Sequence, residues 1–391
     1  MTNEKLFEQS RTLVERAINE GIPLSDLLRT LNKSYDDLRY ASYDLAPFEK
    51  QSYKTLEDFQ IQANEIPAIS FFSGAGGLDL GFEAAGFSHQ GLFEKVPLFC
   101  ETLKANRPGW NVLDNDVSAK DDITSALENS IGSSKFTDGI FLGGPPCQPF
   151  SIAANQRYSK SGDNFKRVGF SHETNGNLLF DYIDLILHFK PRAFLIENVP
   201  GLKEIDDGEQ LKKAYGLLES VGYTVNDPLI LSADKYHVPQ NRKRLFIIGG
   251  KSRKSFVPPA PQKVSLSCAS VFDLDISKCE NHVTREHSAE SVLRYMELAY
   301  GARDQLGRVD RLDPSRPSKT IIAGGTKGGG RSHLHPYFPR TLSVRESARL
   351  QTFPDDYLFT GPVARQFTQV GNAVPPVLAA QLAIAVRNCY F

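Results

Sequence analysis

The stretch FFSGAGGLDLGFEAAGF, residues 71–87, decides the fold expected for this chain. It begins at the end of an apolar run, passes through a glycine-rich turn at Gly74, Gly76 and Gly77, and continues with the spacing of a helix. Glycines permit a sharp backbone turn and the close approach of a ligand. This order indicates an α/β unit with a ligand at the turn, although such turns also occur only to tighten strand–helix packing.

The same stretch bears on which ligand would bind. A dinucleotide fingerprint has the form GxGxxG, and counting from Gly74 places Asp79 where the third glycine is required. An acidic side chain at the start of a helix suits a cation better than a pyrophosphate. The sequence therefore favours S-adenosylmethionine, which carries a sulfonium cation, over a nicotinamide dinucleotide.

Apolar runs alternate with helical patterns through the middle of the chain. The runs are AISFF (68–72), GLFEKV (91–96), GIFL (139–142), AFLIENV (193–199) and RLFIIGG (244–250). Continuous apolar runs are typical of strands buried on both faces. The alternation predicts an α/β, Rossmann-like fold with a doubly wound sheet, parallel or mixed, and ligands bind such sheets at the carboxyl ends of strands.

Three regions follow from these patterns. Residues 66–255, completed by 342–391, are predicted to form the sheet domain, and residues 256–341 a smaller irregular domain. Residues 1–65 are predicted to form a helical extension, either a helix-turn-helix or a small cap or dimer element. Residues 301–340 carry eight Lys and Arg against three Asp and Glu, whereas residues 1–65 carry eight against twelve. Basic surface is therefore expected late in the chain.

The composition is that of an ordinary globular protein. The chain has 391 residues, 40% of them hydrophobic, and a formal net charge of −1. It has no apolar run near the ~20 residues of a membrane span, and its start is too charged for a signal peptide. Its five cysteines include no CxxC pair. We expect a cytoplasmic protein that binds no membrane and no metal, with free thiols.

Two motifs at predicted strand ends carry side chains suited to catalysis. Cys147 lies in GGPPCQPFS (143–151), where prolines restrict the backbone on either side. That stiffness is typical of a nucleophile rather than of a core cysteine. Glu197 follows an apolar run, and we expect it to be partly buried as an acid that holds a proton, or else to form a structural ion pair.

Basic and acidic residues accompany these motifs. In QNRKR (240–244), alternate strand residues share a face, so Gln240, Arg242 and Arg244 are predicted to line an anion-stabilising pocket. Glu94 is placed to accept hydrogen bonds from ribose hydroxyls, and Asp116 from an adenine amino group. The alternative for each is an ordinary solvated side chain.

The order FxGxGG, PPCQPFS, ENV, QNRKR, RESARLQTFP and QVGNAVPP resembles the DNA cytosine-5 methyltransferase family, of the bacterial restriction-modification type. The resemblance runs from about residue 69 to 376 and leaves out residues 1–65. It implies that the Cys147 thiolate adds to cytosine C6 and that Glu197 holds N3 and the exocyclic amine. Arg242 would orient the base at O2, and Arg244 would fix the loop or the glutamate.

The resemblance also implies ligand contacts. Residues 256–341 would read a short sequence in double-stranded DNA, from which the target base is rotated out. S-Adenosylmethionine would contact Phe72, Gly74, Ala75, Gly76, Gly77, Leu78, Glu94, Asp116, Pro146, Asn372, Ala373 and Val374. DNA would contact Gln148, Phe150, Ser151, Gln240, Gly324, Gly325, Lys327 and Arg331.

Partners and rival functions complete these expectations. We expect a monomer on DNA, with a companion restriction endonuclease encoded nearby. The alternatives are a tRNA cytosine-5 methyltransferase, a nicotinamide-dependent oxidoreductase and a catalytically dead DNA-binding protein. The absence of a CFTxxY stretch argues against the tRNA branch, and the intact Cys147, Glu197 and Arg242 argue against a dead protein.

Overall fold

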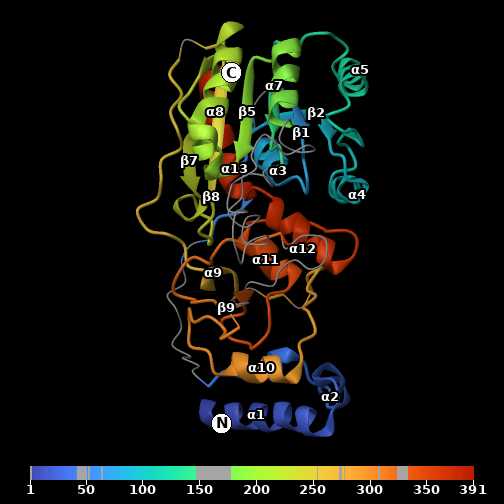
Figure 1. The fold of residues 1–391 in the computed structure, drawn as a ribbon, viewed down its shortest axis with the longest axis vertical. Helices are drawn as coiled ribbons and strands as arrows, with labels where there is room; N and C mark the ends of the chain where they lie inside the picture. The colour runs from blue at the N-terminus through green and yellow to red at the C-terminus, as the bar shows by residue number, and fades with distance from the viewer. Residues whose placement is uncertain are drawn as a thin grey trace. The chain divides into compact units, whose positions relative to one another are not determined.

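The computed structural model describes residues 2–41, 51, 53–62, 65–146, 178–252, 254–272, 275–276, 278–306, 309–323 and 333–391. The chain divides into two compact units (Figure 1). The sheet unit comprises Lys54–Tyr236, Lys243–Gln262 and Val374–Phe391. The irregular unit comprises Met1–Tyr53, His237–Arg242 and Lys263–Ala373.

This division differs from the predicted boundaries in two places. Residues 1–53 belong to the irregular unit instead of forming an extension of their own, and residues 342–373 belong to it instead of completing the sheet domain. The first difference has a clear physical cause, because the apolar face of the N-terminal helices is buried against helix α10 (Ala289–Met296). Val14 from one side and Val292 from the other are fully buried in that contact.

The sheet unit contains one mixed sheet, which agrees with the predicted doubly wound fold. Its strand order is β3-β2-β1-β4-β5-β8-β6, and β7 pairs with β8. Strands β1 to β5 are parallel, whereas β8 is antiparallel to β5, β6 and β7. The strands are β1 (Ile66–Phe71), β2 (Phe87–Phe93), β3 (Val112–Leu113), β4 (Ile140–Gly143), β5 (Ala193–Asn198), β6 (Thr224–Val225), β7 (Leu229–Ser232) and β8 (Lys243–Gly250).

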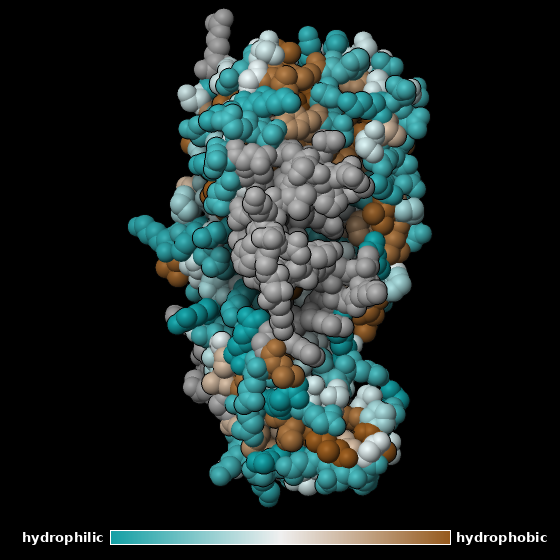
Figure 2. Space-filling model, viewed as in Figure 1, coloured by the Kyte–Doolittle hydropathy of each residue, from teal (hydrophilic) through white to brown (hydrophobic). Residues whose placement is uncertain are grey.

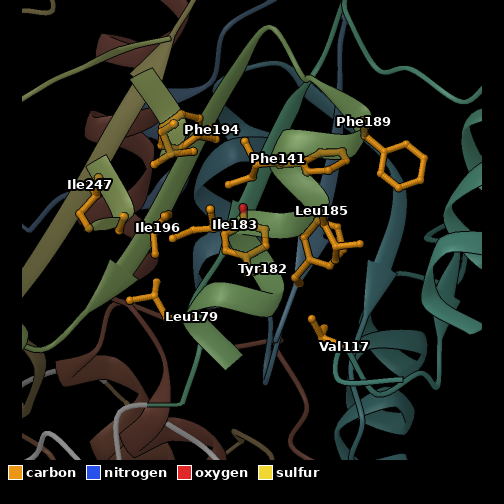
Figure 3. Close-up of a cluster of buried hydrophobic side chains, with 14 of the residues drawn as sticks. Val117, Phe141, Leu179, Tyr182, Ile183, Leu185, Phe189, Phe194, Ile196 and Ile247 are labelled. Atoms are coloured by element: carbon orange, nitrogen blue, oxygen red, sulfur yellow. The ribbon is translucent and has the colours of Figure 1, made fainter. Parts of the chain in front are cut away.

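Helices cover both faces of this sheet, with α7 and α8 in front of it and α13 behind it in Figure 1. Side chains of α5, α7 and α8 share one core cluster with the strands, and Leu127, Ile183 and Leu218 in it are fully buried. Figure 3 shows how α7 lays Leu179, Tyr182 and Ile183 toward the strands. The helical segments are η2 (Leu56–Phe59), α3 (Gly77–Ala84), α4 (Pro97–Asn106), α5 (Lys120–Ile131), α7 (Leu178–Phe189), η6 (Pro200–Gly208), α8 (Glu209–Ser220), η7 (Ala233–Lys235) and α13 (Pro376–Tyr390).

The irregular unit has short elements joined by long connections. A cluster of apolar side chains from α1, α2 and α10 forms one of its cores. Its only described sheet is a parallel pair, β9 (Asp310–Arg311) with β10 (His333–Leu334). The other elements are α1 (Asn3–Glu20), α2 (Leu24–Thr30), η1 (Tyr35–Asp37), α9 (Ala269–Phe272), α11 (Val344–Leu350) and α12 (Val363–Asn372).

One helical stretch within the described residues, Val363–Tyr390, is long and apolar enough to cross a membrane, but 78% of its most apolar part is buried inside the structure. Such burial is expected for core helices, and the stretch is interrupted at Ala373 between α12 and α13. The described surface in Figure 2 is largely hydrophilic. The exposed large apolar side chains are scattered and include Ile230, Val257 and Val264.

Candidate active site at the carboxyl ends of the parallel strands

The carboxyl ends of β1 and β4 form the switch point of the sheet. From β1 the chain continues to β2 and β3 on one side, and it then returns to add β4 on the other side of β1. The loops that leave β1 and β4 therefore diverge, and ligands of doubly wound sheets bind at such a switch point. The glycine-rich turn leaves β1 here, and Gly144, Pro145 and Pro146 leave β4.

The glycine-rich turn has a left-handed backbone at three positions. Phe72, Gly74 and Gly76 have φ angles of 55°, 57° and 72°. Phe72 is a bulky residue in a conformation that glycine adopts far more easily, and such strain is concentrated at functional sites. A Cβ added to Gly74 would meet only the Phe72 carbonyl oxygen, at 3.9 Å. The backbone at Gly74 is therefore open to close approach by a ligand.

Glu94, just past β2, is bound to this turn. Its carboxylate accepts hydrogen bonds from the backbone N–H groups of Gly74 and Val96, each at 2.8 Å. The side chain is buried, which raises the pKa of Glu94, and the N–H groups of Val96 and Gly74 offset part of that rise. Each carboxylate oxygen can accept a second hydrogen bond, so the arrangement suits a partner with hydroxyl groups.

Asp116 follows β3 and forms an ion pair with Lys95, with 2.7 Å between Nζ and Oδ2. Its other oxygen accepts hydrogen bonds from the backbone N–H and the hydroxyl of Ser118. Burial alone raises the pKa of Asp116, but the hydrogen bonds from Lys95 and Ser118 outweigh burial and hold it below its ordinary value. Asp116 is therefore an ionised, oriented acceptor at the strand edge.

Glu197, at the end of β5, is paired with Arg244 on β8. The Arg244 Nε lies 2.9 Å from Glu197 Oε1, and both side chains are largely buried. The position of a Cβ added to Gly144 would be 3.0 Å from Glu197 Oε2, so a larger residue there would press on the carboxylate. The start of the loop after β4, at Gly144, therefore lies directly against the carboxylate of the Glu197–Arg244 pair.

Residues 66–388 match the C-5 cytosine-specific DNA methylase family. The match spans most of the chain and includes the glycine-rich turn, Glu94, Glu197 and Arg244. The chain belongs to the C-5 cytosine-specific DNA methylase family. It is therefore a DNA cytosine-5 methyltransferase.

Relatives of this methylase include bacterial enzymes of similar length. The Type II methyltransferase M.PspPI of Psychrobacter sp. (strain TA137) is 32% identical over 382 residues, covering 87% of this chain and 86% of the relative. M.Eco47II of Escherichia coli is 31% identical, covering 82% and 78%. A solved E. coli prophage protein, described as a DNA modification methyltransferase, superposes with a TM-score of 0.66 at 25% identity over 83% of this chain and 99% of that one.

The QNRKR motif of this methylase departs from the sequence prediction. Strand β8 begins at Lys243, so Gln240 and Arg242 precede it and do not share a strand face with Arg244. Gln240 is fully buried; its amide donates to Leu350 O and Gln351 Oε1, and it accepts from Ile321 N. These hydrogen bonds use the polar atoms of Gln240 inside the irregular unit, and its contact with DNA stays a prediction.

Arg242 has a similar role. Its guanidinium is fully buried and donates to the carbonyl oxygens of Ile321 at 3.1 Å, Gly371 at 2.9 Å and Asn372 at 3.2 Å. A guanidinium that binds three backbone carbonyls holds two segments of the irregular unit together. The structure therefore places Arg244, not Arg242, beside Glu197, and the predicted base-orienting role of Arg242 has no support in the geometry.

Asp79 also departs from its predicted surroundings. It is fully buried on the first turn of α3, and His89 Nε2 of β2 lies 3.2 Å from its carboxylate. Because no part of the Asp79 side chain is exposed, the interpretation that it faces a bound cation is wrong. The departure from GxGxxG at this position reflects an interior Asp79–His89 pair.

Two residues with a place in the site escaped the sequence analysis. Asn198 is buried, and its amide group lies 3.4 Å from the Pro145 carbonyl oxygen, which ties β5 to the loop after β4. Lys95 holds Asp116, as described above. Asn198 directly follows Glu197 in ENV, and Lys95 directly follows Glu94 in GLFEKV. These neighbouring positions were the signal in the sequence that could have indicated them.

The remaining predicted site residues are placed as follows. Ala75, Gly76, Gly77, Leu78 and Val374 are buried in the sheet unit, and Asn372 and Ala373 belong to the irregular unit. Pro146 is the last described residue before a gap. The predicted residues outside the described part of the chain are Cys147, Gln148, Phe150, Ser151, Gly324, Gly325, Lys327 and Arg331.

Proposed function

We propose that this methylase transfers a methyl group from S-adenosylmethionine to C5 of a cytosine rotated out of a short, specific sequence in double-stranded DNA. The observation that carries the proposal is the Glu197–Arg244 pair at the end of β5. It lies against Gly144, which is three residues before Cys147 in the sequence. An oriented carboxylate beside the loop that carries a thiol is the arrangement that this chemistry requires.

The proposed reaction begins with Cys147. Cytosine C5 is a poor nucleophile, so the Cys147 thiolate adds to C6 and converts the ring into an enamine whose C5 is electron-rich. S-Adenosylmethionine, when bound, would supply an electrophilic methyl group for C5; the S–CH3 bond breaks and S-adenosylhomocysteine is the leaving group. A water or hydroxide then removes the C5 proton, the C5–C6 double bond re-forms, and the Cys147–C6 bond breaks to release the thiolate.

Glu197 and Arg244 act on the pyrimidine ring in this proposal. The Glu197 carboxyl accepts a hydrogen bond from the exocyclic amine and shares a proton with N3, which draws electrons from C6 as the thiolate adds. Arg244 Nε fixes one carboxylate oxygen at 2.9 Å, so the other oxygen has a defined direction. Asn198 keeps the Pro145 carbonyl near β5 and so anchors the start of the loop that leads to Cys147.

The residues present fit the proposed cofactor. The open backbone at Gly74 accommodates close approach, and the oriented carboxylates of Glu94 and Asp116 suit ribose hydroxyls and an adenine amino group. Phe72, Ala75, Gly76, Gly77, Leu78, Pro146, Asn372, Ala373 and Val374 are proposed as further contacts. The fit lies in the donor and acceptor chemistry of these groups.

The relatives suggest the biological setting. M.PspPI and M.Eco47II are named Type II methyltransferases. We propose that this chain likewise protects specific DNA sites in a bacterial cytoplasm, as a monomer and beside a companion restriction endonuclease. Residues 256–341 read the sequence in this proposal, with Gln148, Phe150, Ser151, Gly324, Gly325, Lys327 and Arg331 as contacts. Examining the neighbouring genes tests the partner.

Methyl transfer to DNA provides the direct test. The purified protein is incubated with S-adenosylmethionine and unmethylated plasmid DNA, and bisulfite sequencing maps the methylated cytosines. We expect methylation within one short sequence motif, and we expect Cys147→Ser to reduce the rate by several orders of magnitude while still binding DNA and cofactor. Full activity of Cys147→Ser contradicts the nucleophile assignment, and methylation of tRNA instead of the plasmid contradicts the substrate.

A further inference from the structure

A long connection in the irregular unit is bracketed by two short strands. Strand β9 ends at Arg311 and β10 begins at His333, and the two pair in parallel through Asp310 with His333 and Arg311 with Leu334. The residues between them, 312–332, include Arg316, Lys319, Lys327 and Arg331. Whatever holds β9 and β10 together therefore fixes the two strands that flank this basic segment.

Tyr40, from the N-terminal part of the chain, contacts both ends. The guanidinium carbon of Arg311 in β9 lies 3.6 Å from the centre of the Tyr40 ring and 4.0 Å from that of Tyr300. The Tyr40 hydroxyl lies 2.9 Å from the His335 carbonyl oxygen and 3.0 Å from that of Phe338, just past β10. Tyr40 and Arg311 are fully buried, so these contacts are shielded from water.

Asp36 adds a second connection. Its carboxylate forms an ion pair with the buried Arg340, which also makes two hydrogen bonds of 2.8 Å to Glu346. Glu346 in turn accepts a hydrogen bond of 2.7 Å from the backbone N–H of Ser343, the residue that caps α11. Asp36 is thus joined through Arg340 to the segment that follows β10.

The N-terminal helices hold Asp36 and Tyr40 in place. Phe7, Val14 and Ala17 of α1 pack in one apolar cluster with Val292 and Met296 of α10. The Ala41 backbone N–H, directly after Tyr40, donates to the Met296 carbonyl oxygen at 2.8 Å. The chain is therefore fastened on both sides of the contacts made by Asp36 and Tyr40.

We propose that Tyr40 and Asp36 are positioning residues for DNA recognition. They hold β9 and β10, the two strands that flank the basic segment 312–332, in their paired arrangement, and they do not contact DNA themselves. This inference rests on the proposed function of residues 256–341 as the DNA-reading region. It assigns the N-terminal residues, which lie outside the family match, a role in substrate selection.

Three variants of the full-length chain test this inference. Tyr40→Leu keeps a buried apolar side chain but removes the ring over Arg311, Asp36→Asn removes the charge beside Arg340, and Tyr40→Phe removes only the hydroxyl. Glu15→Gln is the matched control, because Glu15 lies on α1 with its side chain 45% exposed and forms an ion pair with Arg11. The substrates are unmethylated plasmid DNA and S-adenosylmethionine, and the KM for each, kcat and the bisulfite map are measured.

The inference predicts a split between the two substrates. Tyr40→Leu and Asp36→Asn should each raise the KM for plasmid DNA about tenfold, and methylation should spread to sites that differ by one base pair. The KM for S-adenosylmethionine and kcat should stay within about twofold of wild type, and Tyr40→Phe should lie between wild type and Tyr40→Leu because the ring remains. Glu15→Gln should match wild type in every measurement.

Other outcomes overturn the inference. Tyr40→Leu and Asp36→Asn with unchanged DNA kinetics and site choice would show that the contacts do not position the segment, and an equal rise in both KM values would show a purely structural role. If Tyr40→Leu does not fold, Asp36→Asn and Tyr40→Phe decide by the same criteria. A wild-type protein that methylates no plasmid cytosine contradicts the proposed function itself, which is a distinguishable result.

Discussion

At the scale of single residues, polar side chains in this methylase are placed by partners that are distant in sequence. Arg244 of β8 forms an ion pair with Glu197 of β5. Arg242, two residues earlier, donates hydrogen bonds to three backbone carbonyl oxygens of the irregular unit. The two arginines belong to one motif and have the same chemistry. What separates their roles is that β8 begins between them, at Lys243.

The Asp79–His89 pair leads to a residue-scale prediction. His89→Leu removes the imidazole 3.2 Å from a fully buried carboxylate. Removing this polar neighbour of the buried carboxylate should lower the free energy of unfolding by roughly 1–3 kcal/mol. Adding Asp79→Asn to His89→Leu should recover part of the loss, because a neutral amide costs less to bury than a charge. Urea unfolding measures both.

The double variant is the internal control for this prediction. Equal stability of His89→Leu and the double variant would mean that the cost arises from packing around the lost ring. In particular, His89 also lies near Trp110, with ring centres 4.9 Å apart, so that packing contact is lost in both variants.

At the scale of elements, the predicted strands and the main helices of the sheet unit are confirmed. All five apolar runs contain or overlap strands. Continuous runs of large apolar residues are typical of strands that are buried on both faces of a sheet. The short strands β6, β7, β9 and β10 were not predicted. They are two to four residues long and have no periodicity of their own, so only their partners define them.

The contact between α3 and α13 leads to an element-scale prediction. A Cβ added to Gly81 would lie 2.4 to 2.7 Å from atoms of Ala379 and Ala380 in α13. Gly81→Ala should therefore push the helices apart and lower the free energy of unfolding by about 1–3 kcal/mol. Thermal unfolding and the KM for S-adenosylmethionine should both report the change, because α3 begins at the glycine-rich turn.

Gly216→Ala is the matched control for Gly81→Ala. Gly216 also lies within a helix, α8, and a Cβ added there has no neighbour within 4 Å. Alanine in that helix should stabilise the protein by roughly 0.5–1 kcal/mol, since it reduces the entropy lost on folding. If Gly81→Ala were as stable as Gly216→Ala, the close packing of α3 on α13 would be refuted.

At the scale of the whole molecule, two buried histidines of the irregular unit should make the stability of the protein depend on pH. In the irregular unit, His287 accepts a hydrogen bond from the Thr341 backbone N–H, and His335 accepts one from that of Tyr337. These acceptors require neutral rings. Burial, aided for His287 by the charges of Arg340 and Arg285, lowers the pKa of His287 to about 4, and burial lowers that of His335 to about 3.

The sign of the pH dependence follows from these values. Protonation favours the unfolded chain, whose histidines titrate near 6.5, so stability falls as the pH drops below about 6.5 and levels off only below the folded values. Each histidine should contribute a loss of about 2 kcal/mol between pH 7 and pH 5. Calorimetry at both pH values should show a lower melting temperature, with a smaller shift in His335→Gln. An equal shift in that variant contradicts the assignment.

The amino-acid sequence by itself determined the sheet, the order of the motifs and the family of this methylase. Those properties depend on local patterns, since apolar runs, glycine-rich turns and motif spacing can each be recognised in short stretches of the sequence. The same patterns correctly named Glu94, Asp116 and Glu197 as residues at strand ends, because the carboxyl ends of parallel strands meet at one edge.

Only the tertiary structure decided which partner each polar group meets. Asp79 turned inward to His89, Arg242 bound backbone carbonyls, and residues 1–53 joined the irregular unit through α10. Periodicity reports which side of an element is apolar, but it does not report which other element covers that side. The contacts of Tyr40 with Arg311, His335 and Phe338 span more than 270 residues of chain, and no local pattern encodes a distance of that kind.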